Sequence, residues 1–240
     1  SSQLEFRDFG VALCRHLLQK EQLRLFNRNL TSQKAKEHLI SPCLRLLTEI
    51  VGFDGGAVAR LAHAKRDIVL KRLDIFLTPN KAQTEGDSED AKKSTLRRNA
   101  QRLVLANLRF QHGSAKSEFI EQHKIMRAFL EHVRRDPPEI VADIVKAIEQ
   151  DIAQDASVPR STKTKFFNRW NLERLVTLYG YDQDLDDSVP EDTRIANQIH
   201  RVLTKVCTKP EMGVLLSQNG WYPPGYDPES PEEVDEGYID

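Results

Sequence analysis

Apolar side chains recur every three or four residues in the most regular stretch of the chain, which begins with Asp136-Pro137-Pro138-Glu139. An aspartate as N-cap, a proline at the first helical position and a glutamate at the third are start signals of an α-helix. The apolar positions that follow are Ile140, Val141, Ile144, Val145, Ile148 and Ile152. Because this period is that of one buried helix face, the sequence predicts a helix here, capped by Asp136.

The same period runs through most of the chain. Residues 4–26, 93–111, 117–133 and 195–206 carry apolar stripes at helical spacing. Another helix is predicted with Ser41 as its N-cap, Pro42 at its first position and Gly52 at its end. No stretch keeps the two-residue alternation of a strand. The sequence therefore predicts an all-α fold.

Two arrangements of such helices fit this pattern: a superhelical stack of helix pairs of the HEAT or armadillo kind, and a compact helical bundle. The absence of identical internal repeats weakens the first but leaves it open, because such repeats diverge widely. We predict the superhelical stack, as one helical-repeat domain over residues 1–220. Residues 78–94 are polar and aperiodic, which predicts a flexible loop between two helices.

The C-terminal segment differs in composition from the rest. Residues 221–240 hold seven Asp and Glu, four prolines and no Lys or Arg. This composition predicts an acidic, extended tail. Residues 1–220 carry 35 basic against 29 acidic side chains, a net charge of +6, which is compatible with a polyanionic partner.

Several classes of protein are disfavoured by the sequence. It has no apolar run of the roughly 18 residues that a membrane span requires, and it does not open with a secretory signal. Cys14, Cys43 and Cys207 are an odd number without Cys-x-x-Cys spacing, as is typical of a reducing compartment. We therefore expect a soluble intracellular protein that has no disulfides and does not contact a membrane.

Motifs for catalysis or for a bound cofactor are also missing. The sequence has no glycine-rich phosphate loop, and none of its seven histidines stands in His-x3-His or His-Glu-x-x-His spacing. The aspartates at 182–187 lack the glycine and glutamate of a calcium loop. We expect no catalytic residue, cofactor, metal ion or small-molecule substrate, and therefore no enzyme.

The basic residues are more informative. Residues 91–117 contain seven Lys and Arg and no acid. At about 100° per residue, Arg98, Arg102 and Arg109 fall within about 40° of one another on a helix, opposite its apolar stripe. Three arginines on one exposed face can follow a phosphate backbone, and the alternative is an ordinary solvated face.

Two further basic clusters occur, around residues 60–72 and 160–170. In the second of them the basic residues alternate with Phe166, Phe167 and Trp170. Basic residues interleaved with aromatics are typical of single-stranded RNA sites, and the alternative is that these aromatics are core. The predicted RNA-binding residues of the three clusters are Arg60, Lys65, Arg66, Arg97, Arg98, Arg102, Arg109, Arg160, Lys163 and Lys165.

Four segments resemble one family in order. They are residues 41–60 (SPCLRLLTEIVGFDGGAVAR), 158–168 (VPRSTKTKFFN), 178–179 (LY) and 205–224 (KVCTKPEMGVLLSQNGWYPP). They are similar to the N-terminal domain of the eukaryotic nucleolar pre-ribosomal-associated protein family, and the likeness extends from about residue 6 to 224. The resemblance implies a helical-repeat scaffold of the early large-subunit precursor, located in the nucleolus of the nucleus. It also implies contacts with precursor ribosomal RNA and with assembly factors that include a DEAD-box helicase, and it implies no catalytic residues.

Residues and resemblance together lead to one functional expectation. We expect a non-enzymatic scaffold that holds precursor ribosomal RNA and assembly factors together, with its basic clusters on RNA phosphates. The alternative is a protein–protein interaction module of the same particle that does not itself bind RNA.

Overall fold

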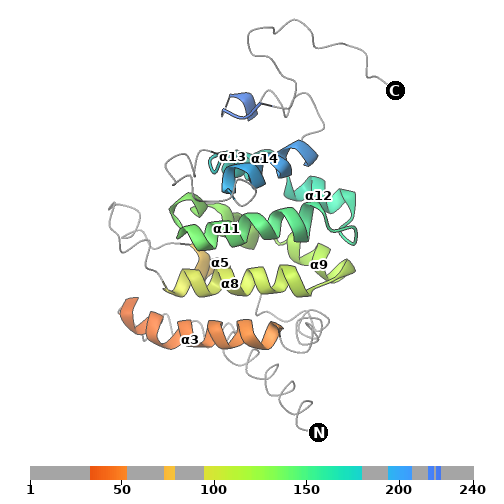
Figure 1. The fold of residues 1–240 in the computed structure, drawn as a ribbon. Helices are drawn as coiled ribbons and strands as arrows, with labels where there is room; N and C mark the ends of the chain where they lie inside the picture. Colours follow the sequence, from red (N-terminus) through yellow and green to blue (C-terminus); the bar gives the residue numbers. More distant parts are fainter. Residues whose placement is uncertain are drawn as a thin grey trace, which may run out of the picture.

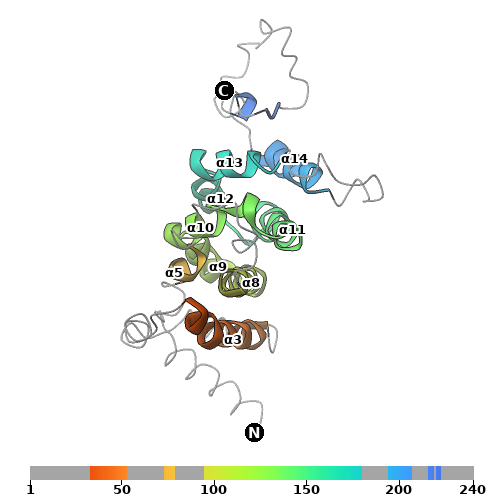
Figure 2. The same cartoon turned by 90° about the vertical axis from the view of Figure 1, so that its left-hand side faces the viewer.

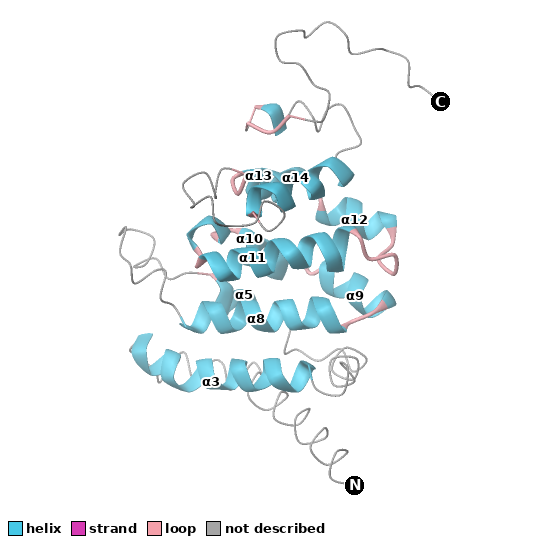
Figure 3. Ribbon diagram, in the orientation of Figure 1, coloured by secondary structure: helices cyan, strands magenta, loops and turns pink. Residues whose placement is uncertain are grey.

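The computed structural model describes residues 33–52, 73–78, 95–179, 194–206, 216–218 and 220–222. Within these residues the regular structure is entirely helical, without a strand (Figure 3). This confirms the predicted all-α fold. The predicted loop at 78–94 apart from Thr78, the helix at 4–26 and the acidic tail beyond Tyr222 lie outside the described residues.

The described helices differ widely in length. They are α3 (Gln33–Gly52), α5 (Leu73–Leu77), α8 (Thr95–Phe110), α9 (Gly113–Ile120), α10 (His123–Leu130), the 3-10 turn η3 (Val133–Arg135), α11 (Pro138–Ala147), the π-helical η4 (Ile148–Ala153), α12 (Arg160–Phe166), α13 (Arg169–Val176) and α14 (Ile195–Val206). The predicted apolar stripes at 93–111, 117–133 and 195–206 all fall on helices.

These helices lie in two layers. One layer stacks α3, α8, α11 and α14 one above another, and the other contains α5, α10, α12 and α13 (Figures 1 and 2). Contacts of α5 with α8 and of α13 with α14 join the layers, and one continuous apolar core fills the space between them. Two layers of helices occur both in repeat stacks and in bundles, so the superhelical arrangement stays a prediction.

The start of α3 differs from the prediction. The helix includes the residues from Gln33 through Pro42 to Gly52, so Ser41 lies inside it and is not its N-cap. Ser41 is buried against α8, where Asn99 Nδ2 donates to its Oγ at 2.6 Å and to its carbonyl oxygen at 3.2 Å. The Ser-Pro pair therefore contributes a buried contact between two helices.

The start of α11 is also corrected. Its N-cap is Pro137, and Asp136 instead lies buried beneath α8, where its carboxylate accepts hydrogen bonds from Arg97 and Gln101. The prediction was wrong because the Asp136 carboxylate is hydrogen-bonded to residues of α8, which lie far away in sequence, and does not cap α11. The apolar stripe behind it is confirmed: its residues are buried through Ile152, with the last turns wound as the π-helical η4.

Two polar contacts complete the core. Asn107 lies within the apolar stripe of α8 and pairs internally, since its Nδ2 donates to Leu103 O and its Oδ1 accepts from Gln111 Nε2. Trp221 is buried near α14, and its Nε1 donates to His200 Nδ1 at 3.2 Å. None of the helices in the described part of the chain is long and apolar enough to cross a membrane.

Candidate nucleic-acid interface

Arg97 has to be removed from the predicted RNA-binding residues. Its side chain is 7% exposed, and its Nε and Nη2 donate to Asp136 at 2.8 and 2.9 Å. Its Nη1 donates to the carbonyl oxygens of Leu77 and Ala128, so the guanidinium joins α8 to α5, α10 and the start of α11. An arginine enclosed in this way is not accessible to an RNA phosphate, and its role is to hold the two layers together.

The other three arginines of α8 form a surface, which we call the α8 arginine face (Arg98, Arg102 and Arg109). Arg102 and Arg109 are exposed and Arg98 is half-buried, so the predicted outward face is present. The Arg109 guanidinium lies 5.9 Å from the Phe110 ring centroid. Whether this face binds RNA stays a prediction. Arg60, Lys65 and Arg66, from the first of the other clusters, lie outside the described residues.

The cluster around α12 contains exposed residues, hydrogen-bonded lysines and buried aromatics. Arg160 is exposed at the first position of the helix. Lys163 Nζ donates to Ala153 O at 2.9 Å, and Lys165 Nζ lies 2.8 Å from Glu121 Oε2 with more than half of its side chain exposed. Phe166 and Phe167 are buried in an edge-to-face pair, so for these two aromatics the core alternative is correct.

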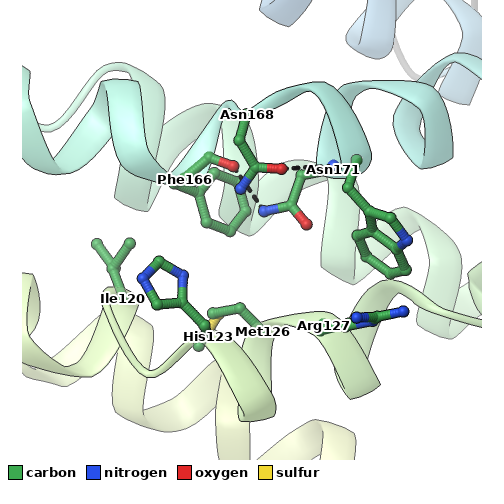
Figure 4. A pocket seen from close by; sticks show the side chains of 8 residues that line it. Ile120, His123, Met126, Arg127, Phe166, Asn168 and Asn171 are labelled. Carbon is green, nitrogen blue, oxygen red and sulfur yellow. Dashed lines mark hydrogen bonds between the residues drawn. The ribbon is translucent and has the colours of Figure 1, made fainter.

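Trp170 differs from these two phenylalanines because it is only half-buried, and it borders an open cleft that Phe166 also lines. The cleft lies between α9 and α10 on one side and α12 and α13 on the other, and its volume is about 230 Å³. We call it the Trp170 cleft; it is lined by Ile120, His123, Met126, Arg127, Phe166, Asn168, Trp170 and Asn171 (Figure 4).

Two guanidinium groups stack on Trp170. Arg127 from α10 lies 5.0 Å and Arg174 from α13 lies 4.9 Å from the centre of the Trp170 ring. A cation over an indole ring is attracted by the ring quadrupole, and the contact restricts the arginine to one orientation. Of these two arginines, Arg127 lines the cleft, so one ordered, positively charged plane forms part of its wall.

Two asparagines lie on the same side of the cleft as Trp170. Asn168 is the N-cap of α13: its Oδ1 accepts from Asn171 N at 3.1 Å, and its Nδ2 donates to Lys165 O. Asn171 Nδ2 donates to Phe166 O at 2.6 Å, which fixes its amide so that Oδ1 is turned toward the cleft (Figure 4). That oxygen accepts no hydrogen bond from the described residues and remains available to a ligand.

The surroundings of the cleft are basic. Residues 121–131 and 160–176 hold seven Lys and Arg against three Glu. Hydrogen bonds from Lys165 and Thr162 lower the pKa of Glu121, so this carboxylate stays ionised and offsets Lys165, while Glu173 pairs with Arg169 at 3.0 Å. An excess of cations remains around Trp170 after these pairs have formed, which favours an anionic partner.

The α8 arginine face and the Trp170 cleft point in different directions. Arg97 faces α5 and α10, whereas Arg98, Arg102 and Arg109 are turned away from it by roughly 100–140° around the helix axis. α10 belongs to the layer that Arg97 faces (Figure 2), and three of the residues that line the cleft come from α10. The fold therefore places these two basic surfaces apart and does not join them in one concave surface.

Sequence reasoning missed four polar residues of the cleft: His123, Arg127, Asn168 and Asn171. The helical period puts His123 and Arg127 one turn apart on the same side of α10, but nothing in the sequence indicates that this side meets Trp170. The Asn-Arg-Trp-Asn sequence at 168–171 contains a capping signal for α13, and this signal could have located both asparagines. Within the described residues no group of three His, Cys, Asp or Glu is placed to hold a metal ion.

The fold and the cleft define an all-helical domain in which ordered arginines surround a partly exposed tryptophan. The family described as "Npa1: Ribosome 60S biogenesis N-terminal" matches residues 1–239. Since this match covers nearly the whole chain, the chain belongs to that family, which takes part in the biogenesis of the 60S ribosomal subunit, and the resemblance found in the sequence is confirmed.

A curated relative is Nucleolar pre-ribosomal-associated protein 1 of Saccharomyces cerevisiae. It is 26% identical to this chain over 184 residues, which are 75% of the chain and 10% of the yeast protein. The chain thus spans about a tenth of the length of this relative. No solved structure matches the chain.

Proposed function

We propose that this domain is a non-enzymatic scaffold in early assembly of the large ribosomal subunit. It holds precursor ribosomal RNA together with assembly factors, among them a DEAD-box helicase, in the nucleolus. Membership of a 60S biogenesis family and the name of the yeast relative support the process and the location. We include in the proposal that the domain catalyses no reaction and needs no cofactor.

The observation that carries the RNA-binding part is the Trp170 cleft. Single-stranded RNA is bound where cations track its backbone and π-systems stack on its bases, and the cleft offers both within one site. Exposed Lys124 and Arg160 on the neighbouring helices add cations that can bind phosphates.

A scaffold also needs more than one binding surface. The α8 arginine face is turned away from the cleft, so a second RNA segment can bind there while the first remains at the cleft. Holding two segments on one rigid body raises their effective concentration toward each other and biases RNA folding without any chemical step.

A binding titration tests this proposal. We expect the chain to bind single-stranded RNA with an affinity that falls as salt rises, because each neutralised phosphate contributes about −0.7 to the logarithmic slope. Exchanging Lys124 and Arg160 together for Glu should weaken binding by about tenfold or more, which corresponds to about 1.4 kcal/mol. The same is expected for Arg102→Glu with Arg109→Glu.

Lys146→Glu provides a control for charge reversal, because Lys146 is exposed on α11, in the other layer from the cleft. It changes the net charge in the same direction and should alter RNA affinity much less than either double reversal. If the chain shows no salt-dependent RNA binding, the alternative of a protein–protein interaction module replaces this proposal.

A further inference from the structure

We propose that the Trp170 cleft binds a single unpaired nucleobase of an RNA strand. This inference rests on the proposed function and adds to it the part of the RNA that the cleft recognises. The base enters the cleft, and its ribose and phosphates remain outside near the exposed cations of α10 and α12.

The size of the cleft favours one base over a larger partner. Its volume of about 230 Å³ is below the roughly 300–1,000 Å³ of sites for drug-sized molecules. A docked peptide helix requires a long groove with anchor pockets at several successive turns, whereas this cleft is one compartment lined by eight residues. A single flat ring system matches it better.

The walls have the chemistry that bases stack on. The Arg127 guanidinium lines the cleft and is itself stacked on Trp170, and RNA-binding proteins stack unpaired bases on aromatic rings and on guanidinium planes. Ile120, Met126 and Phe166 supply an apolar surface for the remainder of the ring. Because Trp170 already orders Arg127, little side-chain entropy is lost when a base stacks on it.

The polar groups predict which bases bind best. Asn171 presents an acceptor toward the cleft, since its amide nitrogen is held by Phe166 O. Adenine and cytosine carry an amino group that can donate to this oxygen, whereas the corresponding group of uracil is a carbonyl oxygen that cannot. We therefore expect adenine and cytosine to be preferred over uracil.

Fluorine NMR of the 240-residue chain labelled with 5-fluorotryptophan provides the test. The chain has two tryptophans, Trp170 and Trp221, and the variant Trp170→Phe assigns their two signals. The probes are AMP, UMP and ribose 5-phosphate, which carries the same sugar and phosphate without a base. We expect AMP to shift the Trp170 signal saturably, UMP to bind several-fold more weakly and ribose 5-phosphate to leave the signal in place. Trp221, buried against His200, is the internal control and should not move.

Two variants test whether the Arg127 guanidinium contributes to AMP binding. Arg127→Gln removes the stacking guanidinium from an exposed position and should lower the AMP affinity about tenfold, while Lys146→Gln loses one charge elsewhere and should leave it unchanged. Equal shifts with ribose 5-phosphate and AMP would identify a phosphate site and overturn the proposal. A shift with a polyglutamate peptide but not with AMP would overturn it in favour of a protein ligand.

The failure of this inference is distinguishable from that of the proposed function. If the chain binds single-stranded RNA in a salt-dependent way while the Trp170 signal does not move with RNA or AMP, the nucleobase site is wrong and the scaffold proposal stands. If the chain binds neither RNA nor AMP, both are wrong.

Discussion

The charged residues of this domain fall into two groups with different physical roles. Arg97 and Lys116 are almost completely buried and bind carboxylates and carbonyl oxygens of the protein itself. Arg102 and Arg160 are exposed and remain accessible to a partner. Sequence alone does not separate the groups, because one position along a helix, from Arg97 to Arg98, turns a side chain by about 100°.

Replacement of Arg97 by Met is expected to destabilise the domain by about 3–5 kcal/mol, because it leaves the buried Asp136 carboxylate without its charged partner. Urea unfolding would measure this loss. Arg102→Met, on an exposed position of the same helix, should stay within about 0.5 kcal/mol. An Arg97→Met variant of unchanged stability but weaker RNA binding would contradict our assignment of Arg97 to the core.

A second prediction concerns Asp155, which accepts a hydrogen bond from buried Lys116 at 2.6 Å. Burial raises the pKa of Asp155, but the hydrogen bonds from Lys116 and Ser157 outweigh it and lower the pKa from 3.8 to about 2. A carboxylate whose pKa is lower in the folded than in the unfolded protein stabilises the fold fully at pH values above its unfolded-state pKa. This stabilisation is lost as the pH falls through its folded-state pKa.

Asp155→Asn removes that contribution. We expect the variant to be less stable than the wild type at neutral pH, and the difference in unfolding free energy to shrink between about pH 4 and pH 2. Unfolding curves recorded at several pH values would measure it. A difference that stays constant over this range would show that the ionised carboxylate of Asp155 is not what holds Lys116.

At the scale of the helices, the apolar period predicted α8, α11 and α14 well, because burial of one face determines where a helix continues. The same reasoning placed two helix starts wrongly. Ser41 and Asp136 both carry strong capping signals, but Asn99 and Arg97, far away in sequence, bind them in the folded protein. Capping and periodicity signals depend only on residues that are close in sequence, so they cannot predict a partner that is distant in sequence. For the same reason they did not predict the contact of Arg127 with Trp170.

One cap can be tested directly. Asn168 caps α13 through its side-chain oxygen, so Asn168→Ala should destabilise the domain by about 1 kcal/mol. Asn168→Ser retains an acceptor oxygen at the N-cap and should recover most of this loss. Thermal unfolding of both variants measures the difference. Equal stability of the Ala and Ser variants would mean that the cap does not determine where α13 begins.

At the scale of the whole molecule, the two helical layers keep the α8 arginine face and the Trp170 cleft apart. The sequence predicted the arginine face and part of the α12 cluster, since these follow from spacing along single helices. It did not predict that the cleft forms, because the cleft is built where α9 and α10 meet α12 and α13. Its existence depends on the packing of segments that lie far apart in the chain.

Hydrogen–deuterium exchange of the chain with and without a ten-nucleotide single-stranded RNA tests the central claim most directly. We expect residues 121–131 and 160–176, which border the Trp170 cleft, to exchange more slowly when the RNA is bound. Bound RNA that leaves the exchange of both segments unchanged would contradict the account, because the strand would then lie on another surface.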